Sequence, residues 1–159
     1  MSRLIPVLTA CALLGCASTY DETYRQETRR LKTQEQARQE QERAAHAEAS
    51  KYAAAVYFDV GSAVIKEAGY KELTWFVQQM RPYPQAMFQV QGFADSTGGD
   101  ALNQGLSQRR AESVARFLQN QGIDASRMAV QGFASEFAAQ SNETATGRTN
   151  NRRVEVTVR

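Results

Sequence analysis

The sequence has few of the residues that form disulfides, metal centres or nucleophilic sites. Its 159 residues include two cysteines and one histidine. Both cysteines, Cys11 and Cys16, lie in an apolar N-terminal segment or directly after it, so the rest of the chain needs no disulfide in any redox compartment. We therefore predict a domain without a metal ion or another cofactor.

Catalytic patterns and strong net charge are also lacking. The single histidine, His46, lies in a polar arm, and no glycine-rich loop opens a helix in the pattern that cradles phosphates. Asp59 and Asp95 are a pair of carboxylates that would suit a glycosidase, but spacing alone gives that interpretation little support. The formal net charge is only +2, which provides no basic field for nucleic acid. These absences favour a binding protein over an enzyme.

Residues 1–15 have the pattern of a bacterial export signal. A basic residue, Arg3, precedes a short apolar run that ends at Leu14. The run is too short to remain as a membrane-spanning helix, which needs roughly 20 apolar residues. The segment leads into LLGC (residues 13–16), which is similar to a bacterial lipobox, where cleavage precedes the cysteine and the cysteine, here Cys16, is acylated. An ordinary secretory signal with an incidental Cys16 is the alternative.

Acylation of Cys16 would provide a stable membrane anchor, because each buried CH₂ group contributes about 0.8 kcal/mol. The next residues, Ala17 and Ser18, differ from the aspartate that retains enteric lipoproteins in the inner membrane. By that resemblance, we expect an outer-membrane lipoprotein that faces the periplasm.

A polar arm occupies residues 16–51. It is rich in Gln, Glu, Arg and Ala, which are good helix formers. Opposite charges recur three residues apart and support a solvated helix. These pairs are Glu22–Arg25, Glu27–Arg30, Glu35–Arg38 and Glu40–Arg43. No heptad stripe of apolar residues persists, so we interpret the arm as a helical or partly disordered spacer; a helix that binds a protein partner is the alternative.

Residues 52–159 have the pattern of one α/β domain. Apolar periodicity predicts strands at residues 53–59, 86–93, 128–133 and 154–158, and helices at residues 68–81 and 100–121. The second helix is expected to face the core with Leu102, Leu106, Val114, Phe117 and Leu118. The order β-α-β-α-β-β predicts a two-layer sandwich, in which a mixed sheet with an antiparallel last strand has its helices on one face.

A short repeat links two of the predicted strands. Residues 90–94 and residues 130–134 both read VQGFA. A glycine inside a strand marks a place where the chain passes close to something, such as a ligand or another segment. We therefore expect Gly92 and Gly132 to be points of close approach, and we interpret the repeat as two similar strand ends and not as two ligand sites.

The stretch from Gly92 to Glu112 carries the candidate site. Asp95 lies at the end of a strand, and Asn103, Ser107 and Arg110 follow at positions i, i+4 and i+7 of the next helix, on one face. An acid and a base that flank one pocket suit a zwitterionic ligand, with its ammonium on Asp95 and its carboxylate on Arg110. A solvated helix charge or a structural salt bridge is the alternative for Arg110.

Several ordered motifs resemble one family of domains. They are Phe58-Asp59, residues 92–95 (GFAD), Asn103, residues 106–111 (LSQRRA), Asn142, Gly147-Arg148 and residues 151–154 (NRRV). Together they resemble the OmpA-like peptidoglycan-binding domain of OmpA C-terminal regions, Pal lipoproteins and MotB, over Val56 to Arg159. The family usually has His-Thr where this chain has Phe93-Ala94, a change expected to remove an imidazole and a hydroxyl from the site rim and to weaken or retune binding.

The resemblance implies a fold, a ligand and a function. The fold agrees with the predicted sandwich, and the implied ligand is the diaminopimelate of the peptidoglycan stem peptide. Asp95 would bind its ammonium and Arg110 its carboxylate, while Asn103 and the loop of Phe58 and Asp59 would complete the wall. The protein would tether the outer membrane to the cell wall, and Arg110→Ala is expected to abolish wall binding without unfolding the domain. The alternative is a subunit of a periplasmic signalling or envelope complex that acts through protein partners.

Overall fold

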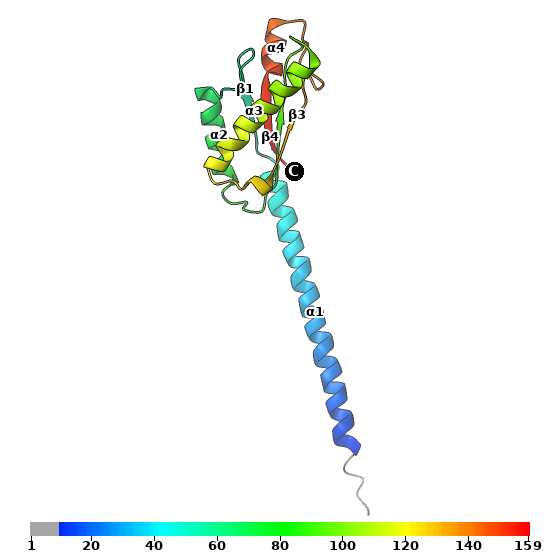
Figure 1. Cartoon of the computed structure of the whole chain (residues 1–159). Helices are drawn as coiled ribbons and strands as arrows, with labels where there is room; N and C mark the ends of the chain where they lie inside the picture. Colours follow the sequence, from blue (N-terminus) through cyan, green and yellow to red (C-terminus); the bar gives the residue numbers. More distant parts are fainter. Residues whose placement is uncertain (1–9) are drawn as a thin grey trace, which may run out of the picture. The chain divides into compact units, whose positions relative to one another are not determined.

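The computed structural model describes the backbone of residues 10–159 and the side chains of residues 20–159 (Figure 1). Most of the predicted export signal (residues 1–9) and the side chain of Cys16 lie outside the described residues. The chain divides into two compact units, one that ends at Ala44 and one that spans Ala45–Arg159.

The arm is helical. Helix α1 spans Ala10–Ala49, and its side chains in the first unit are almost all exposed. The predicted pair Glu35–Arg38 forms at 2.7 Å, whereas Arg25 pairs with Asp21, four residues earlier, at 2.7 Å. Residues 20–44 of this helix have mixed charge and no buried side chain, a pattern that favours the spacer interpretation. In residues 10–159, no helix has the length and apolar character needed to cross a membrane.

The second unit contains a four-stranded mixed sheet. Its strands are β1 (Ala53–Tyr57), β2 (Phe88–Gly92), β3 (Met128–Gly132) and β4 (Arg153–Val158), in the order β1-β4-β2-β3. β2 and β3 are parallel, and β4 is antiparallel to both β1 and β2. The antiparallel last strand that the sequence predicts is thus confirmed.

Helices cover one face of this sheet. They are α2 (Glu67–Met80) and α3 (Asp100–Asn120). A 3₁₀ turn at Ala125–Arg127 precedes β3, and the short helix α4 (Ala145–Asn151) precedes β4. α2 and α3 lie on the same side of the sheet, with α2 against β1 and α3 against β2 and β3 (Figure 1). The predicted two-layer α/β sandwich is therefore confirmed. The segment between β3 and β4, for which apolar periodicity predicts no helix, contains α4.

Alternation along the strands builds the core between the two layers. The fully buried side chains on the strands include Phe88, Val90, Val154 and Val156, and those on the helices include Leu73, Phe76, Val114 and Leu118. Burying one such side chain contributes about 1.5–3 kcal/mol.

One core prediction is wrong. Leu102 is 63% exposed. At this end of α3 the inward positions are taken by Asn103, Ser107 and Arg110, all of which are buried. Leu102 lies one residue before Asn103 and is therefore turned away from the sheet.

The two copies of the repeat lie side by side. In the parallel pair of β2 and β3, Val90 is opposite Val130 and Gly92 is opposite Gly132. A Cβ atom on Gly92 would lie 2.1 Å from the carbonyl oxygen of Ser107, and one on Gly132 would lie 2.4 Å from the backbone nitrogen of Gln108. The predicted close approach is confirmed, and the approaching backbone is that of α3.

Candidate functional site

The candidate site lies at one edge of the sheet. β1 and β2 point in the same direction, because each is antiparallel to the β4 strand between them. The residues that follow β1 and β2 therefore meet the residue that precedes β4. These residues include Asp59, Asp95 and Arg152, and Arg110 reaches them from the inward face of α3.

Arg110 is completely buried and is held by main-chain carbonyls. Its Nε donates to the carbonyl oxygen of Ser62 at 2.8 Å, and its Nη2 donates to that of Asp59 at 2.9 Å. Its Nη1 donates to the carbonyl oxygen of Phe93 at 3.0 Å. The guanidinium also lies over the Phe58 ring, 5.3 Å from its centroid. Arg110 thereby links the segment after β1 to the segment after β2.

The charge of Arg110 has no carboxylate partner. Of the ion pairs found among residues 20–159, none includes Arg110. Burial lowers its pKa to about 10, an effect that the negative charge of Asp95 opposes and the positive charge of Arg152 reinforces. The group is still protonated at neutral pH, so the domain buries a cation without pairing it.

Asp95 is a buried carboxylate that is already paired. Its Oδ2 accepts a hydrogen bond from Nη1 of Arg152 at 2.8 Å, and its Oδ1 accepts one from the backbone N–H of Thr97 at 2.9 Å. Burial raises the pKa of this carboxyl, but the hydrogen bonds from Arg152 and Thr97 outweigh burial, so the net pKa lies below the ordinary value. Asp95 is therefore ionised at neutral pH.

Asp95, Arg110 and Arg152 form what we call the charged cluster. It contains two guanidinium groups and one carboxylate, and the charges of Asp95 and Arg152 both shift the pKa of Arg110. One positive charge is thus left without a partner among the described acidic side chains. An incoming carboxylate would neutralise it through charge-assisted hydrogen bonds.

The other predicted site residues support this cluster. Asn103 donates from Nδ2 to the carbonyl oxygen of Asp95 at 3.1 Å, and Phe58 places its buried ring under Arg110. Asp59 contributes its carbonyl oxygen, while its exposed carboxylate pairs with Lys66 at 2.6 Å. The structure therefore gathers all five predicted residues, with the Asp59 side chain directed to a surface lysine.

Arg152 is the member of the cluster that sequence reasoning did not single out. It lies in the matched motif NRRV, but only the pairing of β4 with β1 and β2 brings it to Asp95. The neighbouring loop is also tied to this edge, since Asn142 accepts from the backbone N–H of Ser96 at 3.2 Å and from Nδ2 of Asn151 at 2.8 Å.

The ring of Phe93 lies away from the cluster. It stacks on Phe133, with ring centroids 5.7 Å apart, and Arg153 lies over its other side at 4.1 Å. Because Gly92 faces α3, the next residue on the strand faces the opposite side of the sheet. The Phe93 ring therefore packs outside the charged cluster, and only its carbonyl oxygen reaches Arg110. The effect of Phe93-Ala94 on binding stays a prediction.

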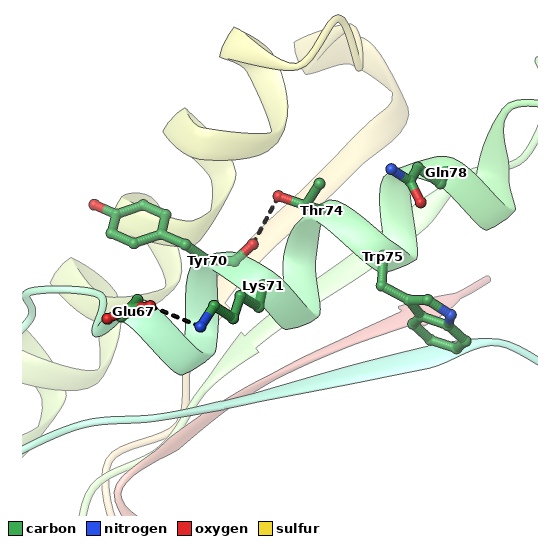
Figure 2. A pocket seen from close by; sticks show the side chains of 6 residues that line it. All are labelled: Glu67, Tyr70, Lys71, Thr74, Trp75 and Gln78. Carbon is green, nitrogen blue, oxygen red and sulfur yellow. Dashed lines mark hydrogen bonds and ion pairs between the residues drawn. The ribbon is translucent and has the colours of Figure 1, made fainter.

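A shallow hollow lies along the exposed side of α2, away from the charged cluster's residues (Figure 2). Its volume is about 370 Å³, and its lining residues are Glu67, Tyr70, Lys71, Thr74, Trp75 and Gln78. All six belong to one helix, and the charges of Glu67 and Lys71 neutralise each other at 2.6 Å. Unlike the charged cluster, this hollow has no unbalanced charge to attract a ligand.

Comparisons with known proteins place this chain in a family. The sequence model of the OmpA family matches residues 57–152. The probable lipoprotein YiaD of Escherichia coli (strain K12) is 48% identical over 103 residues, which cover 65% of this chain and 47% of that protein. The chain spans less than half the length of several curated relatives that it matches.

Solved structures share the fold. The peptidoglycan-associated lipoprotein from Burkholderia pseudomallei superposes with a TM-score of 0.64 at 26% identity, over 67% of this chain and 90% of that chain. The cell wall anchor of the T6SS from Pseudomonas aeruginosa superposes with a TM-score of 0.58 at 29% identity, over 67% of this chain and 79% of that chain. The match of the family over most of the second unit and the shared fold lead to one conclusion: the chain belongs to the OmpA family.

Proposed function

We propose that the second unit binds peptidoglycan without catalysis, through the diaminopimelate of the stem peptide. The observation that carries this proposal is the buried, unpaired cation of Arg110 beside the ionised Asp95. A ligand end with one carboxylate and one ammonium fits the two groups, since each charge then meets its opposite in a site shielded from water.

Arg110 has the capacity to bind a carboxylate. Three of its five N–H groups have main-chain acceptors, and the other two remain for a ligand. The lowering of its pKa to about 10 corresponds to roughly 3 kcal/mol of cost for keeping the charge. A bound carboxylate offsets part of that cost. Because Arg110 has no exposed surface, a carboxylate reaches it only if a neighbouring segment shifts.

This arrangement sets the specificity. Lysine-type stem peptides provide the ammonium for Asp95 but no carboxylate for Arg110, and amidated diaminopimelate provides a neutral group there. Both ligands leave the buried cation unpaired, so both are expected to bind more weakly. Two structures with the same fold are named a peptidoglycan-associated lipoprotein and a cell wall anchor, which supports the proposal.

The rest of the chain suits a tether between a membrane and the wall. In this proposal residues 1–15 are removed, Cys16 carries the lipid, and residues 16–51 are the spacer before the binding domain. A helix gains about 1.5 Å per residue, so the helical arm after Cys16 reaches roughly 50 Å. A relative is named a probable lipoprotein, and others are outer membrane proteins, which supports a place at the outer membrane on the periplasmic side.

The test is the substitution Asp95→Asn, which is nearly the same size. We expect the full chain, purified in detergent, to lose at least about 30-fold in affinity for sacculi that contain diaminopimelate, because a neutral amide does not replace a buried carboxylate for the ammonium. Sedimentation with sacculi measures this. Asp124→Asn is the matched control, because Asp124 lies before β3, at the opposite end of the parallel pair β2 and β3 from Asp95, and it is expected to bind normally.

The same variant has a defined pH dependence. The lowered pKa of Asp95 means that its ion pair contributes stability above the unfolded pKa of about 3.9, and that this contribution is lost as the pH falls through the folded value. Acid unfolding of Asp95→Asn should therefore depend less on pH below about pH 4 than that of the wild type. In the binding test, normal binding of sacculi by Asp95→Asn would rule out Asp95 as the group that binds the ammonium of the ligand.

Phe93→His tests whether the departure from the family pattern affects binding. Because the ring stacks on Phe133 and Arg153, we expect the free energy of unfolding to fall by about 1–2 kcal/mol. The affinity for sacculi is expected to change by less than about two-fold, since only the main chain of residue 93 contacts Arg110. A ten-fold change in affinity would place residue 93 in contact with the ligand.

A further inference from the structure

We propose that Arg152 is a positioning residue that keeps Asp95 apart from Arg110, so that a zwitterionic ligand can bridge the two. This inference deepens the proposed function and rests on it. The puzzle that it answers is that a buried carboxylate and a buried guanidinium, close enough for one charge to act on the other, form no ion pair. Opposite charges in a poorly solvated site attract strongly, so something must hold them apart.

The contacts of Arg152 show how it is fixed. Nη1 binds Oδ2 of Asp95 at 2.8 Å, and Nη2 binds the hydroxyl of Thr149 at 2.9 Å. Nε donates to the carbonyl oxygen of Phe58 at 3.1 Å. The planar guanidinium is thus attached in three directions, to the segments after β1 and β2 and to α4. Its side chain is 12% exposed, so little water competes for these bonds.

The main chain of Arg152 is anchored as well. Its carbonyl oxygen accepts from the backbone N–H of Phe58 at 2.8 Å, and its own N–H donates to the carbonyl oxygen of Arg148 at 3.2 Å. Phe58 therefore bonds both to the backbone and to the side chain of Arg152. A side chain attached at both ends cannot follow Asp95 toward Arg110 without breaking several buried hydrogen bonds.

Asp95 keeps room for a ligand in this arrangement. Arg152 occupies one lone-pair direction of Oδ2, and the N–H of Thr97 occupies one of Oδ1. Each carboxylate oxygen has a second direction, which an ammonium with three donors can use. Arg152 thus stays in place when the ligand binds. Without it, Arg110 would be the strongest cation left for Asp95, and their pairing would consume both groups that the ligand needs.

Arg152→Gln tests the proposal. Arg152→Lys is the second variant, which keeps the positive charge but lacks the planar guanidinium with its several donors. We expect Arg152→Gln in the full chain to lose at least ten-fold in affinity for a diaminopimelate muropeptide. We expect Arg152→Lys to recover part of this loss. Isothermal titration calorimetry at neutral pH measures both affinities.

A ligand-free readout separates this inference from the proposed function. In Arg152→Gln the NMR signal of the Arg110 Nε–H should shift as Asp95 approaches and pairs with it. The pKa of the Asp95 carboxyl should stay below its ordinary value, because Arg110 then replaces Arg152 as its partner. Both results are expected whether or not any muropeptide binds. Absence of muropeptide binding by the wild type would overturn the proposed function instead.

If Arg152→Gln does not fold, Arg152→Lys is measured alone. A folded variant with wild-type affinity, with an unmoved Arg110 signal, or with an Asp95 pKa raised above its ordinary value would overturn the role of Arg152.

Discussion

Arg110→Ala is expected to destabilise the domain by about 3 kcal/mol and to abolish its binding to diaminopimelate peptides. The substitution removes the donors for three main-chain carbonyls and leaves a cavity over the Phe58 ring. The structure thus argues against the expectation from sequence that this variant loses binding without unfolding. Chemical denaturation of the full chain measures the loss of stability.

Two further variants separate the charge of Arg110 from its packing. Arg110→Lys keeps the charge but lacks the planar guanidinium with its several donors. We therefore expect a smaller loss of stability than in Arg110→Ala, and a loss of affinity of about 10- to 100-fold. Arg109→Ala removes the exposed neighbour, and its effect is expected to stay within about 0.5 kcal/mol. Equal stability of Arg110→Ala and Arg109→Ala would show that the carbonyl contacts contribute nothing.

Gly92→Ala is expected to lower the free energy of unfolding by about 3 kcal/mol or more. The new Cβ would lie 2.1 Å from the carbonyl oxygen of Ser107, and backbone on both sides prevents an inexpensive adjustment. α3 must move off the sheet, and Arg110 moves with it. Thermal or chemical unfolding measures the change, and sacculus binding is expected to fall in parallel.

Gly105→Ala is the matched control: Gly105 lies in α3, the helix that Gly92 contacts, and its substitution is expected to change the free energy of unfolding in the opposite direction. The nearest atom to its Cβ is Nη1 of Arg109 at 3.2 Å, the mobile end of an exposed side chain. Alanine inside a helix is favoured over glycine by about 0.5–1 kcal/mol, so this variant should be more stable than the wild type. Destabilisation of both variants by the same amount would contradict the close contact between α3 and the sheet at Gly92.

Local patterns were enough to predict the framework. Strands with alternating apolar residues and helices with a 3.6-residue period were located to within a few residues, because side chains that face one core repeat with the geometry of the backbone. The repeat at residues 90–94 and 130–134 predicted a close approach, since only glycine admits another backbone at that distance. Asp95 and Arg110 followed from the strand-turn-helix pattern that connects them.

Other features depend on contacts between distant segments. The pairing of Arg152 with Asp95 requires β4 to lie between β1 and β2, and no local period in the sequence encodes that order. The contribution of Asp59 comes from its carbonyl oxygen, which every residue type has. Leu102 was assigned to the core because it is apolar, although the polar Asn103 holds the inward position.

The central claim is that the charged cluster recognises one zwitterionic end of the stem peptide, and titration by calorimetry tests it most directly. The full chain in detergent would be titrated with a diaminopimelate muropeptide, its amidated form and a lysine muropeptide. We predict saturable binding of one diaminopimelate muropeptide per chain, with NMR shifts at Asp95, Arg110 and Ser62, and binding of the other two that is weaker by at least ten-fold. Equal affinity for all three, or no binding of any, would contradict the claim and direct attention to protein partners of the helical arm.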